Sequence, residues 1–179
     1  TKGFPVAGNV FCTKESIAKY FGITTADLIP KLTKAIDQRS QPEEIQNAPC
    51  QEVDIGTVDL NKLPIFKYNK GDGGKYISSA VVITRDPEYG QNLDFHRAMP
   101  ISKTKMTMRV VEGRHFDTFL KEQGELDVAF CVGNSPPVLV AAGTSVDIGV
   151  NELEIANALE PFQVVKAKTS NLLIPADCE

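Results

Sequence analysis

The sequence predicts an α+β fold, and three observations support this prediction. Two stretches with helical spacing of apolar residues lie near the start, at residues 13–23 and 24–39. A polar, proline-bearing stretch follows at 40–49, and beyond it short β-rich runs are separated by Gly, Pro, Asn and Asp. Helices followed by a mostly β region are typical of this class. We therefore divide the chain into an N-terminal α/β segment, residues 1–46, and a β-rich domain, residues 47–179.

The N-terminal segment is expected to contain one strand and two helices. The strand runs into a turn at residues 3–12. In the first helix, Thr13 is a suitable N-cap and Gly22 a suitable end. In the second helix, Thr24 and Asp27 have the spacing of a capping box. The inward positions of this second helix are Leu28, Leu32, Ala35 and Ile36.

The remaining residues are expected to form strands and one further helix. The expected strands are residues 50–55, 75–84, 105–111, 126–133, 136–143 and 162–169. Helical spacing at residues 151–160 interrupts them, with Leu153, Ala156 and Leu159 facing inward. The apolar run before the final residues 174–179 also resembles a strand.

The composition restricts the class of function. Of the 179 residues, 42% are hydrophobic and 23% are charged, as in ordinary globular proteins. The net charge of −4 argues against a nucleic-acid partner, and no apolar run approaches the roughly 18 residues of a transmembrane helix. No signal peptide is evident. The four cysteines are far apart, so we expect reduced thiols in a cytoplasmic protein and no zinc site.

Residues 90–99, GQNLDFHRAM, combine unusually many polar groups in a short stretch. They could form a solvated strand edge, or they could lie against a charged ligand or a metal. A glycine cluster at residues 70–76, KGDGGKY, could bring backbone N–H groups to a phosphate. It lacks the P-loop pattern and leads into a strand, which favours a tight turn.

Three separate residues could together ligate a metal. Asn92 offers a neutral oxygen, His115 an imidazole, and Glu152 a carboxylate at the start of a helix. Such a mixed set suits Mn²⁺ or Mg²⁺ better than zinc, and the cation could hold a cofactor phosphate. The alternative is that these residues, which are distant in sequence, serve unrelated structural roles.

Three arginines lie close in sequence to Asn92 or His115. They are Arg97, Arg109 and Arg114. Each guanidinium could hold a phosphate or a carboxylate through two parallel hydrogen bonds. The alternative is that they are surface charges that point to solvent.

Several motifs now resemble one family in the correct order along nearly the whole chain. DGGKYISSAVVITRDPEYGQNLDFHR is similar to the central signature of the UbiD-type decarboxylases, which depend on prenylated FMN. FPVAGNVFCTKESIAKYFGI and APCQEVDIGTVDLNKLPIF resemble the preceding family segments. NELEIANALEPFQVVKAKTSNLLIPADCE resembles the segment that follows. The resemblance implies a split β-barrel like that of flavin reductases, truncated here, after a small α/β domain.

The resemblance also implies cofactors and partners. Prenylated FMN would be held through Mn²⁺ (or Mg²⁺), with K⁺ or Na⁺ nearby, and a flavin prenyltransferase would supply it. The substrate would be a small carboxylic acid, and the full-length protein would form a homo-oligomer. By position, the metal ligands would be Asn92, His115 and Glu152. The flavin would also be lined by Phe95, His96, Arg97, Arg109, Val110, Val111 and Arg114.

Arg97 matches the catalytic arginine of the family, which orients the substrate carboxylate within a Glu-Arg-Glu network. The segment carrying the two acids would begin beyond Glu179. We expect the chain, which starts at Thr1 without Met, to be an inactive fragment of a longer decarboxylase. The competing hypothesis is a truncated or split flavin- or metal-binding module without catalysis.

His96 departs from the Tyr that many members carry before the arginine. A similar N-x-x-F-H-R pattern is found in a branch common in archaea. Members of that branch are thought to decarboxylate trans-anhydromevalonate phosphate. Hydroxylated or polyprenyl benzoates are the other main substrates of the family, and the sequence leaves the choice open.

Overall fold

The computed structural model describes residue 5 and residues 7–178. The α-helices are α1 (Lys14–Tyr20), α2 (Leu28–Asp37), α3 (His115–Gln123), α4 (Pro136–Ala142) and α5 (Glu152–Leu159). Short 3₁₀ helices are η1 (Thr25–Asp27), η2 (Pro49–Gln51) and η3 (Leu60–Lys62). The strands are β1 (Glu43–Ile45), β2 (Val81–Asp86), β3 (Gly90–Phe95), β4 (Ala98–Pro100), β5 (Met106–Met108), β6 (Val128–Cys131), β7 (Gln163–Lys166) and β8 (Leu173–Pro175).

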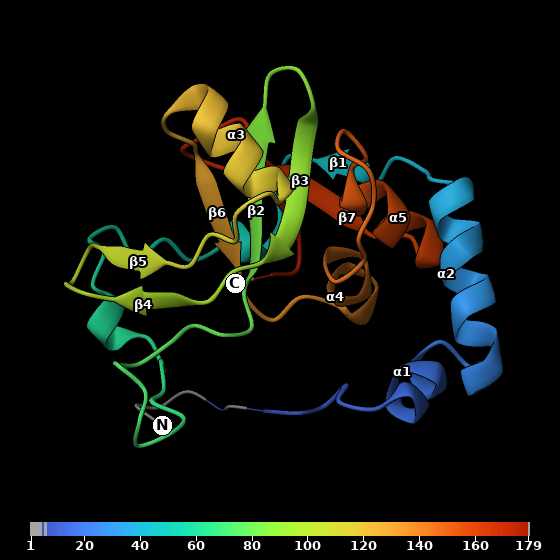
Figure 1. The fold of residues 1–179 in the computed structure, drawn as a ribbon, viewed down its shortest axis with the longest axis horizontal. Helices are drawn as coiled ribbons and strands as arrows, with labels where there is room; N and C mark the ends of the chain where they lie inside the picture. The colour runs from blue at the N-terminus through green and yellow to red at the C-terminus, as the bar shows by residue number, and fades with distance from the viewer. Residues whose placement is uncertain (1–4, 6, 179) are drawn as a thin grey trace.

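The strands of the described part form three small sheets, ordered β3-β2-β6, β1-β7-β8 and β4-β5 (Figure 1). Within the central sheet β2 is antiparallel to both of its neighbours. These sheets do not close into a barrel over the described residues, so the split barrel stays a prediction. The mixed α+β class is confirmed.

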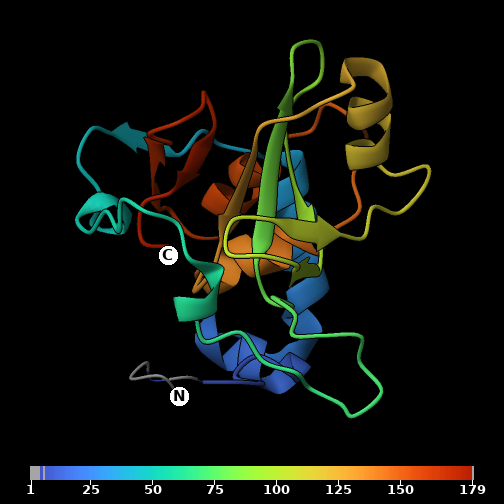
Figure 2. The same cartoon turned by 90° about the vertical axis from the view of Figure 1, so that its left-hand side faces the viewer.

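Helices cover both faces of the central sheet. α3 lies on one side, and α4 and α5 lie on the other, as the two views of Figures 1 and 2 show together. α5 also contacts α2, so it is enclosed between that helix and β3. Because both faces are covered, the first four residues of β2 (81–84) are fully buried. The hydrophobic core joins β2 and β3 to α4 and α5.

The predicted helices near the N-terminus are confirmed with their caps. The Thr13 hydroxyl accepts from the Ser16 N–H at 3.1 Å at the start of α1. The Asp27 carboxylate accepts from both the N–H and the hydroxyl of Thr24. Pro30 lies in the first turn of α2, where its missing N–H leaves no hydrogen bond unmade. The helix predicted at 151–160 is α5, and its three inward residues are buried.

Two predicted strands were wrong, and two further stretches differ in part from what the sequence pattern suggests. The strand predicted at 136–143 is instead α4, with Gly143 as its C-cap, because prolines at the first helical positions and two alanines in the last turn suit a helix. Residues 50–55 form part of η2 and a bend. The polar stretch 40–49 contains β1, which pairs in parallel with the distant β7. The strand predicted at 3–12 lies partly outside the described residues, and residues 7–12 form none.

α3 and the short pair β4-β5 illustrate the limits of the sequence pattern. α3 was not predicted, because its two buried residues, Phe116 and Phe119, carry little periodic signal. Of the strand predicted at residues 105–111, only residues 106–108 form a strand, which is β5. The division at residue 46 stays a prediction. None of the described helices is long and apolar enough to span a membrane.

The burial of α5 generates a prediction for stability. Leu153 is fully buried in the core, whereas Ile29 on α2 is 68% exposed. We expect Leu153→Ala to lower the free energy of unfolding by about 2–5 kcal/mol, because it removes packed methyl groups and leaves a cavity. Ile29→Ala is the control and should change it by less than about 0.5 kcal/mol. Urea denaturation measures both, and equal losses would contradict the packing described here.

Candidate metal and cofactor site

β3 is the edge strand of the central sheet and presents its polar residues away from the core. Leu93 points into the core and is 1% exposed. Since side chains alternate along a strand, Asn92 and Asp94 share the opposite face. β2 pairs with one edge of β3, which leaves N–H groups on the other edge without a strand partner.

The Glu152 carboxylate provides an acceptor for one of these unpaired N–H groups. Its Oε2 accepts a hydrogen bond of 2.8 Å from the Leu93 N–H, and the residue is only 2% exposed. Glu152 is the first residue of α5, and Asn151 caps the helix by accepting from the Leu153 N–H at 3.1 Å. The helix start therefore brings a buried carboxylate directly against β3.

The pKa of Glu152 is raised to about 7. Burial is the main cause, and the charge of Asp94 adds to it; hydrogen bonds from the backbone N–H groups of Leu93 and Glu152 lower it in part. No basic side chain forms an ion pair with Glu152 in the described part of the chain. A buried carboxyl of this kind is suited to a bound cation, which would compensate its charge.

His115 completes the set of predicted metal ligands. It is the first residue of α3, and its Nδ1 lies 2.9 Å from Asn92 Oδ1. The structure thus brings Asn92, His115 and Glu152 to one cavity, although they come from β3, α3 and α5. That all three line it is the main agreement between the sequence prediction and the geometry.

The cavity has a volume of about 220 Å³ and is lined by residues of four segments. Its lining residues are Asn92, Leu93, Asp94, Phe95, His96, Val111, Arg114, His115, Ala142, Gly143, Thr144, Ser145, Val146 and Glu152. Of the residues predicted to contact a flavin, Phe95, His96, Val111 and Arg114 are among them. Arg97, Arg109 and Val110 are not, and both arginines are exposed.

The donor set fits a divalent cation. The ligand atom that Asn92 could offer is Oδ1; its Nδ2, which can only donate, is buried without a hydrogen-bond partner among the described residues. An amide oxygen, an imidazole and a carboxylate are ligands that Mn²⁺ or Mg²⁺ accepts. Among the described residues, no cluster of three or more His, Cys, Asp or Glu side chains is arranged around a metal position. The predicted set contains only two residues of those types, because its third is asparagine.

His96 is held between two oxygen atoms. Its Nδ1 lies 2.8 Å from the Arg109 carbonyl oxygen and its Nε2 lies 2.8 Å from Asp94 Oδ1. The second contact lacks hydrogen-bond geometry, and it becomes an ion pair when the imidazole is protonated. Burial lowers the pKa of His96, but the two oxygens and the Asp94 charge outweigh it, so the pKa is raised overall.

The sequence prediction missed two parts of this site. Asp94 lies in the polar stretch 90–99 but was assigned no role. The loop of residues 143–146 follows α4, and its residues line the cavity. Because α4 was predicted to be a strand, the turn that brings this loop to β3 was not expected. At this turn the Phe95 ring lies 3.8 Å from the position that a Cβ on Gly143 would occupy.

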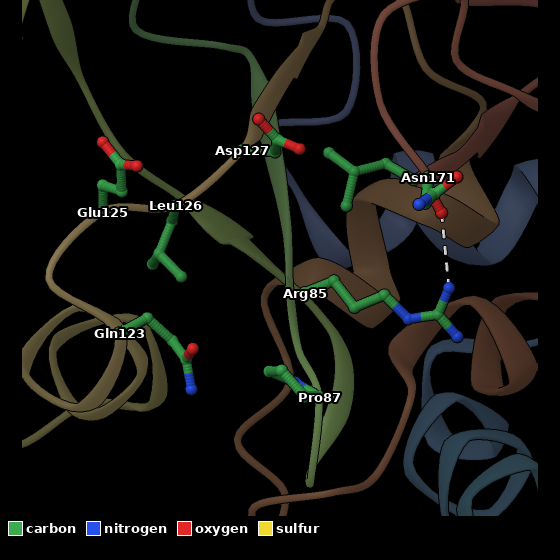
Figure 3. A pocket seen from close by; sticks show the side chains of 8 residues that line it. Arg85, Pro87, Gln123, Glu125, Leu126, Asp127 and Asn171 are labelled. Atoms are coloured by element: carbon green, nitrogen blue, oxygen red, sulfur yellow. Dashed lines mark hydrogen bonds between the residues drawn. The ribbon is translucent and has the colours of Figure 1, made fainter.

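A second hollow lies elsewhere on the molecule and contains none of the predicted site residues. It is lined by Arg85, Pro87, Gln123, Glu125, Leu126, Asp127, Asn171 and Leu172 (Figure 3). The Arg85 guanidinium already donates to the Asn171 carbonyl at 3.3 Å, and Gln123 donates to Asp86 at 3.0 Å. Its main polar groups are therefore engaged within the fold.

The glycine cluster at 70–76 is a tight turn, as the alternative interpretation had it. The Asp72 carboxylate accepts from the N–H groups of Tyr68 and Asn69 at 3.1 and 2.8 Å. Gly74 approaches Met99 so closely that a Cβ there would lie 2.7 Å from the Met99 sulfur. A side chain at position 74 would therefore require the Met99 side chain to move.

Comparison with known proteins identifies the family. Residues 43–179 match the family model of the UbiD 3-octaprenyl-4-hydroxybenzoate carboxy-lyase Rift-related domain. The chain belongs to the UbiD family. The family resemblance drawn from the sequence motifs is thereby confirmed.

Curated UbiD-like relatives are longer than this chain. It is 35% identical over 180 residues to the anhydromevalonate phosphate decarboxylase of Methanocaldococcus jannaschii, covering 97% of this chain and 42% of that protein. It is 33% identical over 164 residues to the phenolic acid decarboxylase of Bacillus subtilis, covering 83% and 34% respectively. The chain therefore spans less than half the length of these relatives.

Solved UbiD-class structures share the fold. The TM-score is 0.87 against HmfF from Pelotomaculum thermopropionicum in complex with FMN, at 31% identity, covering 93% of this chain and 40% of that one. It is also 0.87 against the vanillic acid decarboxylase of Sedimentibacter hydroxybenzoicus in closed form, at 28% identity, covering 96% and 40%. An evolved dimeric form of HmfF has been solved with prFMN.

The raised pKa of Glu152 generates a prediction for the metal-depleted protein. Its folded state binds a proton more tightly than the unfolded state, in which the pKa is near 4.5. Wild-type stability should therefore fall as the pH rises from about 4.5 to about 7 and then level off. Glu152→Gln keeps an acceptor for the Leu93 N–H without the charge, so at pH 8 it should be more stable than wild type by about 3 kcal/mol.

Urea denaturation in a chelator at pH 4 and pH 8 measures this difference, which should nearly vanish at pH 4. Glu122→Gln, at an exposed position of α3, is the control and should show no such pH dependence. A Glu152→Gln variant that is less stable than wild type at pH 8 would contradict the uncompensated burial of this carboxylate.

Proposed function

We propose that the protein containing this chain is a UbiD-type carboxy-lyase that removes CO₂ from an unsaturated or aromatic carboxylic acid. Family membership supports the reaction class. The observation that carries the proposal is the convergence of Asn92, His115 and Glu152 on one cavity, from three separate elements. These are the positions that the family pattern assigns to the metal.

The cofactor we propose is prenylated FMN, held through Mn²⁺ or Mg²⁺, with K⁺ or Na⁺ nearby. Solved structures of similar proteins with FMN and prFMN support a flavin. In this chain the cation would lie among Asn92, His115 and Glu152, and the cation would compensate the buried carboxylate. The flavin would rest against Phe95, His96, Arg97, Arg109, Val110, Val111 and Arg114. When bound, the prenylated flavin supplies the electron sink that departing CO₂ requires.

Arg97 is the residue we assign to the substrate carboxylate. Its guanidinium is exposed and forms no ion pair with any described residue, so it is free to form two parallel hydrogen bonds to a carboxylate. Such a grip orients the scissile bond and lowers the entropy cost of reaching the reactive geometry. A carboxylic acid must then protonate the product; the family pattern assigns this to glutamates that no segment of this sequence matches.

Two substrate classes should be assayed first. Anhydromevalonate phosphate is acted on by the archaeal relative at 35% identity, and phenolic acids by the Bacillus relative at 33% identity, as their names state. Because the chain spans less than half of these relatives, the assays should use the protein as its native cell makes it. An intact mass well above 19.5 kDa supports the decarboxylase. A mass near that value favours a flavin- or metal-binding module that needs a partner.

The metal assignment predicts the behaviour of Asn92→Ala. Loss of the amide oxygen should lower the bound divalent metal and flavin to less than about a tenth of wild type, because the remaining ligands hold the cation poorly. Metal analysis and flavin absorbance of the purified protein measure this. Asn92→Asp keeps an oxygen ligand and is the matched control, which should retain metal. Full flavin content in Asn92→Ala would refute the assignment.

The catalytic assignment predicts a different result for Arg97→Ala. Metal content should stay at the wild-type level and the flavin should remain bound through the other residues of its site, while kcat falls by about 10²-fold or more, because the substrate carboxylate loses its bidentate partner. Arg97→Lys keeps the charge without the planar fork and should recover only a small part of the rate. CO₂ release at saturating substrate measures kcat. Near-normal turnover in Arg97→Ala would remove this residue from the mechanism.

A further inference from the structure

The β4-β5 ladder ends at two arginines that face each other. Ala98 pairs with Met108 in the antiparallel register, so Arg97 and Arg109 are the next pair. The Arg109 N–H donates to the Arg97 carbonyl at 3.3 Å. Like charges directly opposite each other destabilise a ladder. In the described residues neither guanidinium has an acidic partner to relieve this repulsion.

The ladder also lacks its return hydrogen bond at this pair. A hydrogen-bonded antiparallel pair exchanges two N–H···O bonds. Over the part of the chain that is described, the Arg97 N–H makes no such bond to the Arg109 carbonyl. That carbonyl oxygen instead lies 2.8 Å from His96 Nδ1. The imidazole therefore takes the place of the missing backbone bond.

The orientation of this imidazole is fixed from three sides. The ring of Phe116 lies 4.8 Å away between centroids, and His96 is 5% exposed. Asp94 Oδ1 lies 2.8 Å from Nε2. A ring flip would place carbon atoms where Nδ1 and Nε2 now lie, and it would remove the contacts with the Arg109 carbonyl and the Asp94 carboxylate. Asp94 therefore favours the ring orientation in which Nδ1 reaches Arg109.

We propose that Asp94 is a positioning residue: its carboxylate orients the His96 ring, and the ring fixes the backbone of Arg109 and, across the ladder, of Arg97. This inference rests on the proposed role of Arg97 and extends it to a residue that the family resemblance leaves without a role. Among the described residues, the ion-pair partner of the Asp94 carboxylate is His96 and not Arg97. Its effect passes from a side chain on β3 to the backbone of the neighbouring ladder.

The geometry explains why a small displacement would matter. The guanidinium of Arg97 is exposed, so its placement depends on its backbone and not on packing around the side chain. The backbone is held on one side by the single 3.3 Å bond from Arg109. Without the imidazole contact to the Arg109 carbonyl, we expect the Arg97–Arg109 pair to be held less firmly against the repulsion between the two arginines.

The test compares Asp94→Ala with Asp94→Asn in the complete protein loaded with Mg²⁺. Asp94→Asn keeps a polar side chain of the same shape facing Nε2, whereas Asp94→Ala removes it. We expect Asp94→Ala to lower kcat by about tenfold with flavin and metal content unchanged, and Asp94→Asn to recover most of the rate. Asp147→Ala, at an exposed position between α4 and α5, is the control for removal of an acidic charge.

A second readout does not depend on turnover. In ¹⁵N NMR spectra, the backbone amides of Arg97 and Arg109 and the ring nitrogens of His96 should shift in Asp94→Ala and stay close to wild type in Asp94→Asn. If neither substrate class is turned over by wild type, the proposed function fails while these spectra still test the positioning role. Unchanged spectra and kcat in Asp94→Ala, or an equal loss in both variants, would overturn the inference.

Discussion

The hydrogen bond from the Leu93 N–H to the buried carboxylate of Glu152 joins the parts of this molecule that form its site. It attaches the first turn of α5 to the free edge of β3. The same helix packs against α2 and α4, so the bond connects the helical layer to the sheet. Because a carboxylate is costly to bury, a fold that keeps one at its centre needs a compensating partner there. The proposed cation would be that partner.

The register of β3 links the core to the site. Leu93 pairs with Ile83 and fills the core, while its neighbours Asn92 and Asp94 face the cavity. A shift of one residue would expose Leu93 and bury two polar side chains on the core face. The stability of the core therefore selects the one register in which Asn92 meets His115. Substitutions in the core would be felt at the site for this reason.

Charge is distributed in a way that suits the proposed cofactor. An acidic and a neutral oxygen donor, from Glu152 and Asn92, lie in the cavity beside the His115 imidazole. Arginines occupy its edge and the adjoining ladder, at Arg114, Arg97 and Arg109, without acidic partners in the described structure. The inner region therefore favours a cation, and the outer region favours anions. This arrangement suits a phosphate held through a divalent metal, with a carboxylate substrate close by.

The sequence by itself determined the helices α1, α2 and α5 and most of β2, β6 and β7, because capping residues and apolar spacing are local signals. It also supplied the identities of Asn92, His115 and Glu152 as suitable ligands. Only the tertiary structure decided that these three meet, that β1 lies within a polar stretch, and that residues 136–142 are helical. The contact of Asp94 with His96 belongs to the same group. Each of these features depends on residues far away in the chain or on packing against other elements. Local sequence patterns do not indicate such distant contacts.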